Sequence, residues 1–240
     1  MHVIETPYTY LGSELDVFQH AVNWKRYWGT RIRPYLGASV LEVGAGIGGT
    51  TRVLFDDRYA SWTGLEPDVA MVEQLREQQA QGDLPAKCDF RLGDISMLAA
   101  DELFDSIIYI DVLEHIERDV EELIKAAEHL KPGGHLIVLS PAFQYLYTAF
   151  DHAIGHYRRY TRAALREITP PGCQVRQQFY LDAVGMMASL ANKWLLKKPD
   201  PSLQQILFWD RVLVPLARVV DPLTGYAFGR SVISVWQRSG

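Results

Sequence analysis

The sequence lacks the features that mark several specialised classes of protein. Its 240 residues include only two cysteines, Cys88 and Cys173, which have no metal-binding spacing and are too few for a disulfide scaffold. It also has no basic excess, because 24 lysines and arginines stand against 29 aspartates and glutamates, giving a net charge of −5. A long polyanion such as DNA or RNA would therefore meet net repulsion. We expect a reducing, cytoplasmic location and no nucleic-acid partner.

Long hydrophobic runs and export signals are missing as well. A bilayer-spanning helix needs about 20 apolar residues, and in the most apolar region, residues 183–220, Arg211 and Arg218 bracket only a short apolar run. The first 16 residues carry acids where a signal peptide has a basic region and an apolar core. The overall composition, 48% hydrophobic and 22% charged, is that of an ordinary globular chain. We predict one domain, residues 1–240, with no membrane span.

Strand and helix patterns alternate along the chain from residue 39 onward. Single helices between strands imply right-handed crossovers, a parallel sheet covered on both faces, and binding sites at the carboxyl ends of the strands. The predicted strands are the short apolar segments at residues 39–43, 61–65, 88–92, 104–110, 135–139, 174–181 and 231–237.

A glycine-rich turn follows the first predicted strand. In VLEVGAGIGGTT, residues 40–51, glycines leave the backbone open to close approach by a nucleotide-like ligand. Gly44, Gly46 and Gly49 also satisfy the dinucleotide fingerprint, so the turn alone does not distinguish an adenosyl ligand from a dinucleotide. Glu42 brings a carboxylate to the turn, which favours a cationic ligand over a pyrophosphate.

Two further acids follow the next two predicted strands. Glu66 stands where a carboxylate can accept hydrogen bonds from both ribose hydroxyls, which is common to adenosyl and dinucleotide sites. Asp94, in LGDI, is placed to accept from an adenine amino group while Ile95 packs on the ring. The third acid favours an adenosyl ligand.

Taken together, VLEVGAGIG, the acid in LEP, GDI, FDSIIYIDVLEHI and LKPGGHLIVLSP resemble the successive motifs of class I methyltransferases. The resemblance covers residues 33–140, and the terminal SVISVWQ is similar to the antiparallel last strand of that fold. It implies a doubly wound, Rossmann-like α/β fold. The seven strands would have the order 3-2-1-4-5-7-6, with extra helices between the last two.

The same resemblance implies S-adenosylmethionine as cofactor and an activity of methyl transfer to a small-molecule acceptor. It also implies a role for each matching residue. Glu42, Gly44, Gly46 and Gly48 would line the methionine part, Glu66 the ribose, Asp94 and Ile95 the adenine, and Asp111 the strand end beside the reacting sulfur.

Within the single domain we expect four segments. Residues 1–32 form an N-terminal helical cover carrying Trp24, Tyr27 and Trp28, and residues 33–182 form the core. Residues 183–229 form a helical lid or insertion, and 230–240 the last strand. A dimer face or a membrane-surface face remains open for the apolar helices of the third segment, so a homodimer is a possible assembly.

The acceptor side is predicted from the segment FDHAIGHYRRYT, residues 150–161. Whether the reaction uses a general base is left open; for a nitrogen or oxygen acceptor that uses one with a pKa near neutral, His152, His156 and His115 are the candidates, with Asp111 beside them. Arg158 or Arg159 would pair with a carboxylate or phosphate on the acceptor. The alternative is that these arginines pair with acids of the protein and the histidines only support the loop.

Other functions remain as alternatives. A nicotinamide-dependent oxidoreductase fits the glycine turn, and a non-catalytic adenosyl-binding protein fits the fold. A DNA amine methyltransferase needs an Asn/Asp-Pro-Pro-aromatic motif where this chain has Asp111, Val112, Leu113 and Glu114. A metal-dependent mechanism needs a cluster of oxygen ligands, and only Asp111 is suitably placed, so no metal is predicted. The acceptor, its reacting atom and the oligomeric state are left open.

Overall fold

The computed structural model describes residues 14–195 and 202–240. Its seven strands form one sheet in the order β3-β2-β1-β4-β5-β7-β6, which confirms the predicted fold class. All neighbouring strands are parallel except β7, which runs antiparallel to both β5 and β6. The strands are β1 (Ser39–Val43), β2 (Ser61–Glu66), β3 (Cys88–Leu92), β4 (Phe104–Ile110), β5 (Leu130–Pro141), β6 (Cys173–Leu181) and β7 (Ser231–Arg238).

The central strands divide the apolar residues between two cores. Successive side chains of a strand point to opposite faces, and in β4 Ile107 joins one core while Ile108 joins the other. Neighbouring residues of β5 alternate in the same way, as Leu136 and Ile137 show. Strands buried on both faces explain why these segments read as unbroken apolar runs instead of alternating patterns.

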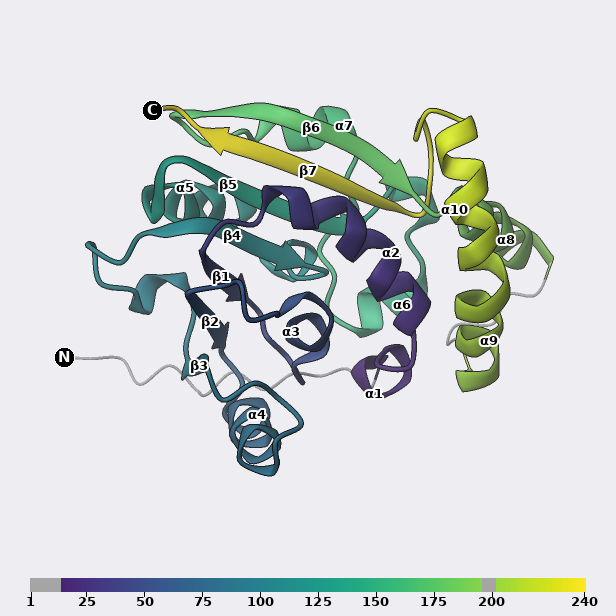
Figure 1. Cartoon of the computed structure of the whole chain (residues 1–240). Helices are drawn as coiled ribbons and strands as arrows, with labels where there is room; N and C mark the ends of the chain where they lie inside the picture. Colours follow the sequence, from purple (N-terminus) through teal and green to yellow (C-terminus); the bar gives the residue numbers. More distant parts are fainter. Residues whose placement is uncertain (1–13, 196–201) are drawn as a thin grey trace.

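Helices cover both faces of the sheet (Figure 1). On one face, α5 (Asp119–Glu128) and α7 (Arg162–Glu167) contribute Leu123 and Leu165 to the core. On the other face, α2 (Val22–Ile32) contributes Trp24, Tyr27, Trp28 and Ile32. The remaining helices before β6 are α1 (Glu14–Phe18), α3 (Gly49–Leu54), α4 (Val69–Gln81) and α6 (Ala149–Ala153).

The segment between β6 and β7 is helical and lies beyond the carboxyl edge of the sheet (Figure 1). It consists of α8 (Ala183–Leu195), α9 (Leu203–Phe208), one π-helical turn at Trp209–Leu213 and α10 (Val214–Leu223). The π-helical turn lies directly before Pro215, which stands in the first turn of α10. Proline has no N–H to donate, so the regular α-helical ladder cannot run through it unchanged.

Buried aspartates attach this helical segment to the rest of the molecule. Asp221 of α10 accepts hydrogen bonds from the backbone N–H groups of Asp182 (2.7 Å) and Ala183 (2.9 Å) and from the hydroxyl of Tyr27 in α2 (2.8 Å). Asp182 accepts from the indole N–H of Trp209 at 2.8 Å. Because a buried carboxylate left without these donors would be costly, the contacts hold the helices close to α2.

The predicted division into cover, core, lid and last strand stays a prediction, and its residues 1–13 and 196–201 lie outside the described ones. Across the part of the chain that the structure describes, no helix combines the length and the apolar character needed to cross a bilayer.

Candidate functional site

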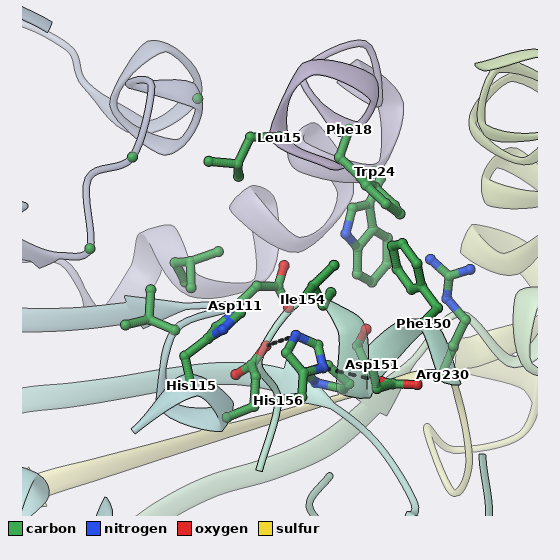
Figure 2. A pocket seen from close by; sticks show the side chains of 18 of the residues that line it. Leu15, Phe18, Trp24, Asp111, His115, Phe150, Asp151, Ile154, His156 and Arg230 are labelled. Atoms are coloured by element: carbon green, nitrogen blue, oxygen red, sulfur yellow. Dashed lines mark hydrogen bonds and ion pairs between the residues drawn. The ribbon is translucent and has the colours of Figure 1, made fainter. Parts of the chain in front are cut away.

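A cavity of about 1990 Å³ opens at the carboxyl edge of the sheet. Pockets for one drug-sized ligand are typically about 300 to 1000 Å³, so this cavity has room for two small molecules together. Its walls combine the glycine-rich turn, the turns after β2, β3 and β4, the loop after β5, α1 and α2, and α9 with the turn that follows it. Aromatic rings from α1 and α2, including Phe18 and Trp24, form one wall (Figure 2).

The glycine-rich turn connects β1 to α3 and forms part of this wall. Gly44, Gly46 and Gly48 all have positive φ angles of 53–78°, which other residues adopt only with strain. The Gly44 N–H donates to the carbonyl of Leu65 at 2.8 Å, which ties the turn to β2. A Cβ on Gly44 would lie 2.5 Å from the side chain of Val112, whereas one on Gly46 would make only an ordinary contact, 3.8 Å from Leu15 Cδ1.

Two of the residues predicted to line the methionine part, Glu42 and Gly48, do not border the cavity. Glu42 Oε2 accepts hydrogen bonds from Thr51 (2.5 Å) and from the indole N–H of Trp62 (2.8 Å). Burial raises the pKa of Glu42 to about 7. Gly48 likewise faces inward, because a Cβ there would lie 2.9 Å from Leu84. Gly44 and Gly46 do border the cavity.

The acids after β2 and β3 lie on the cavity wall. Glu66 Oε2 accepts from the Gly46 N–H at 2.8 Å and Oε1 from the Asp68 N–H at 3.0 Å, so both carboxylate oxygens have fixed positions. Burial raises the pKa of Glu66. Asp94 also lines the cavity and accepts from Ser96 through Oδ1, while Ile95 is fully buried in the core and does not border the cavity.

Lys25 of α2 brings a cation into the cavity that the sequence had not suggested. Its Nζ would lie 2.7 Å from a Cβ built on Gly49, so the ammonium group sits against the start of α3. Among the described residues it makes no hydrogen bond or ion pair, and burial lowers its pKa. A partly buried ammonium without an acid against it is a candidate anchor for a ligand carboxylate.

Asp111 follows β4 directly and has a φ of 54°, an uncommon value for a residue other than glycine. The Asp111 side chain borders the cavity and is surrounded by protein on its other sides. This burial raises its pKa to about 6. Electrostatic interactions with His156, Arg230 and Lys25 oppose the rise.

The loop after β5 contributes a histidine held by a buried acid. His156 Nδ1 lies 3.1 Å from Asp151 Oδ1, and its ring meets that of His115 edge to face at 4.5 Å between centroids (Figure 2). Asp151 is also bound by Arg159, whose Nε and Nη2 donate to it at 2.7 and 3.0 Å. These bonds lower the pKa of Asp151, although burial alone would raise it.

Glu114 lies in the turn after β4, three residues beyond Asp111, and is fully buried. Its Oε2 accepts from the hydroxyl of Ser140 at 2.9 Å, while its Oε1 has no hydrogen-bond partner and lies 4.0 Å from His156 Nε2. Burial and the charge of Asp111 raise its pKa well above the ordinary value. The neighbouring His115 has its pKa lowered to about 4, mainly by burial, so it is neutral at neutral pH.

The structure separates the remaining candidates for the acceptor side. His152 is exposed and does not border the cavity, whereas His115, His156 and Asp111 do. Arg158 donates to Asp119 (2.7 Å) and to the carbonyl of Glu117, outside the cavity. Arg159 borders the cavity and is engaged with Asp151.

Sequence reasoning missed four charged residues of the cavity, namely Lys25, Glu114, Glu122 and Arg230. The motif DVLEHI contained a signal for Glu114, because the carboxylate stands in the same short turn as Asp111 and His115. No local pattern indicated Lys25 or Arg230, which reach the cavity from α2 and from the residue before β7.

Comparison with known proteins gives a consistent result. Residues 41–138 match the family model described as "Methyltransferase domain". The chain is 28% identical over 153 residues to a demethylmenaquinone methyltransferase of Tropheryma whipplei, covering 64% of this chain and 59% of that protein. It is 29% identical over 134 residues to a tRNA U34 carboxymethyltransferase of Methylococcus capsulatus, covering 55% and 41%. The chain thus spans less than two thirds of the length of these relatives.

Among solved structures, the chain resembles coclaurine N-methyltransferase bound to N-methylheliamine and SAH. The TM-score is 0.61 with 15% sequence identity, and the match covers 91% of this chain and 72% of that one. At this identity the similarity concerns the fold.

Proposed function

We propose that the chain is a class I S-adenosylmethionine-dependent methyltransferase that transfers a methyl group from that donor to a small molecule, which the match of residues 41–138 to the methyltransferase family model supports. The observation that carries the proposal is the pairing of Glu66 with the Gly46 N–H on the wall of the large cavity. The bond joins the glycine-rich turn to the acid after β2, which are the two elements that would hold the methionine and ribose parts of one ligand.

In this proposal the donor lies along the carboxyl ends of β1, β2 and β4. Glu66 accepts from the ribose hydroxyls, Asp94 lies on the adenine side, and Lys25 binds the donor carboxylate. The sulfonium then lies near Asp111, which is supported by the position of this acid directly after β4 and by its opening to the cavity. A negative group beside a sulfonium stabilises the bound donor.

Methyl transfer is an in-line displacement, so the protein must hold the acceptor, the methyl carbon and the sulfur collinear in a site closed to water. The acceptor would occupy the part of the cavity between Asp111 and the loop after β5. His156 is the proposed base. The contact between its Nδ1 and Asp151 orients the ring, so that Nε2 is the nitrogen that points toward Glu114. His115 stays neutral beside it.

A small acceptor is favoured by the enclosed aromatic wall of Phe18 and Trp24 and by the net charge of −5. A tRNA acceptor is the second candidate, and the relative named for tRNA U34 favours it. The apolar wall suits a small acceptor with apolar groups, whereas RNA recognition depends on basic contacts to phosphates.

Calorimetry on the purified full chain tests the donor assignment. We expect S-adenosylhomocysteine to bind with measurable heat and NADH to give none; the reverse would support an oxidoreductase. With methyl-labelled donor, we expect label to enter the small-molecule fraction of a cell extract and not added bulk tRNA. Donor binding without transfer to either fraction would instead support a non-catalytic adenosyl-binding protein.

A further inference from the structure

We infer that Glu114, His115 and His156 form a binding site for a divalent transition-metal ion on the acceptor side of the cavity. One ligand atom from each of these three residues, a carboxylate oxygen and two imidazole nitrogens, lies within 4.8 Å of the others. The three residues come from the turn after β4 and the loop after β5, which meet above the carboxyl edge of the sheet (Figure 2).

The first support is the unpaired oxygen of Glu114. Its side chain is fully buried, yet Oε1 has no hydrogen-bond partner, which is costly for a carboxylate. His156 Nε2 is 4.0 Å away, which is too far for a hydrogen bond. Two ligands at about 2.1 Å from one ion lie at most about 4.2 Å apart, so this separation fits a shared ion after a small side-chain rotation.

The second support is the way His156 is held. A metal-binding histidine usually donates its other ring N–H to a carboxylate, which fixes the ring and leaves one nitrogen free for the ion. Asp151 takes that place, with its Oδ1 at 3.1 Å from His156 Nδ1, and Arg159 fixes Asp151 in turn. The nitrogen that faces Glu114 is therefore the one with the lone pair.

The donor set indicates the kind of ion. Mg²⁺ and Ca²⁺ prefer oxygen ligands only, whereas two imidazoles and one carboxylate suit Zn²⁺, Mn²⁺ or Fe²⁺. The sequence-based prediction of no metal rested on oxygen ligands from Asp111 alone, and the distance in sequence between Glu114 and His156 hid the imidazole contribution. His115 and His156 supply the two imidazole nitrogens of this donor set and Glu114 the carboxylate oxygen.

The role of such an ion rests on the proposed function, and an ion bound at His156 Nε2 would replace that nitrogen as the group that activates the acceptor. An acceptor hydroxyl that approaches the ion loses its proton to water more easily. The oxygen electron pair then forms the new bond to the methyl carbon, the carbon–sulfur bond breaks, and its electron pair stays on sulfur as S-adenosylhomocysteine is released. The substrate class that fits is a small molecule with an acidic or enolic hydroxyl group.

The test uses tag-free full-length protein from which metals have been removed with a chelator. We expect Zn²⁺ to bind at one equivalent in calorimetry and Co²⁺ to give visible d–d absorption. Glu114→Gln and His156→Ala should each weaken Zn²⁺ binding by about 100-fold or more, and Asp151→Asn by about 10- to 100-fold, the range for residues that orient a ligand. His152→Ala is the matched control, because this exposed histidine lies in the same loop.

S-adenosylhomocysteine binding is measured on the same variants, both as a test of folding and to separate the two proposals. Donor binding in the Glu114 and His156 variants together with loss of Zn²⁺ binding supports the site. Absence of stoichiometric Zn²⁺ binding, or equal affinity in the parent protein and in Glu114→Gln and His156→Ala, overturns it. Metal binding without any donor binding would contradict the proposed function and leave the metal site standing.

Discussion

The carboxylate of Asp210 accepts the backbone N–H of Trp24 at 2.8 Å, across 186 residues of sequence. It also accepts the N–H of Asn23 at 3.2 Å, so it binds the first turn of α2, where Ala21 provides no side-chain cap. The first N–H groups of a helix have no partner within the helix. The helical segment between β6 and β7 thus caps the helix that carries Lys25 and Trp24 into the cavity.

Replacing Asp210 with alanine should therefore destabilise the protein by about 1 to 2 kcal/mol, the usual cost of losing an N-terminal cap. Urea denaturation monitored by circular dichroism measures this change. Asp101→Ala, at an exposed position, serves as the control and should leave the free energy of unfolding nearly unchanged. Equal stability of the two variants would show that the bond to Trp24 does not stabilise the fold.

Lys25 is predicted to bind the carboxylate of the donor. Lys25→Met keeps much of the side-chain volume and removes the charge, so a charge-assisted hydrogen bond worth about 1.5 to 3 kcal/mol is lost. We expect S-adenosylhomocysteine to bind about 10- to 100-fold more weakly in calorimetry. Arg26→Met, one residue along α2 and exposed, should bind normally. Unchanged affinity in Lys25→Met would place the donor carboxylate elsewhere.

Glu66 is predicted to hold the ribose while it receives the Gly46 and Asp68 N–H groups. Glu66→Gln removes the charge and exchanges one acceptor oxygen for an N–H donor, so one of these backbone donors would face another donor. Binding of S-adenosylhomocysteine should weaken about tenfold or more. Glu73→Gln, on the exposed face of α4, is the matched control. A variant that binds as tightly as the parent protein would contradict the assignment.

Gly48 and Gly82 allow the cost of a backbone angle to be separated from the cost of crowding. Both have positive φ, 78° and 84°, but an added Cβ meets Leu84 at 2.9 Å in one case and nothing within 4 Å in the other. Gly82→Ala should cost about 1 to 2 kcal/mol from the angle alone. Gly48→Ala should cost about 1 to 3 kcal/mol more, because a packed core must shift. Thermal or urea unfolding would reveal the difference, and equal losses would refute the crowding at Leu84.

The buried Glu42 predicts a pH dependence of stability. Because its pKa is raised to about 7 in the folded protein, the neutral carboxyl stabilises the fold at low pH. That contribution is lost as the pH rises from the unfolded pKa near 4.5 through about 7. Glu42→Gln removes the titration, so its stability relative to the parent protein should rise over this window by on the order of 2 kcal/mol. Urea unfolding at pH 5 and pH 8 measures the change, and a difference independent of pH would contradict it.

Much of the fold followed from local patterns. The apolar runs and the glycines after the first strand depend on residues close together in the chain. Six of the seven strands lie within one residue of their predicted bounds, and β5 begins five residues earlier than predicted, at Leu130. The alternation of strand and helix then restricts a parallel sheet to few topologies. The resemblance to class I methyltransferases supplied the strand order.

The site was only partly predictable, because a sequence position does not state where a side chain points. Glu42 stands next to the turn in sequence, but the pleat of β1 directs it toward Trp62 and away from the cavity. Conversely, His156 meets Glu114 because the loop after β5 folds back over the turn after β4.

By itself the sequence determined which residue types stand at the ends of the strands, since strand boundaries and turn chemistry arise from neighbouring residues. Only the tertiary structure decided that Lys25 enters the cavity, that Asp210 caps α2, and that Glu114 keeps an unpaired oxygen near two histidines. These contacts join segments far apart in the chain, and they form when the two faces of the sheet are covered and the loops are packed against each other.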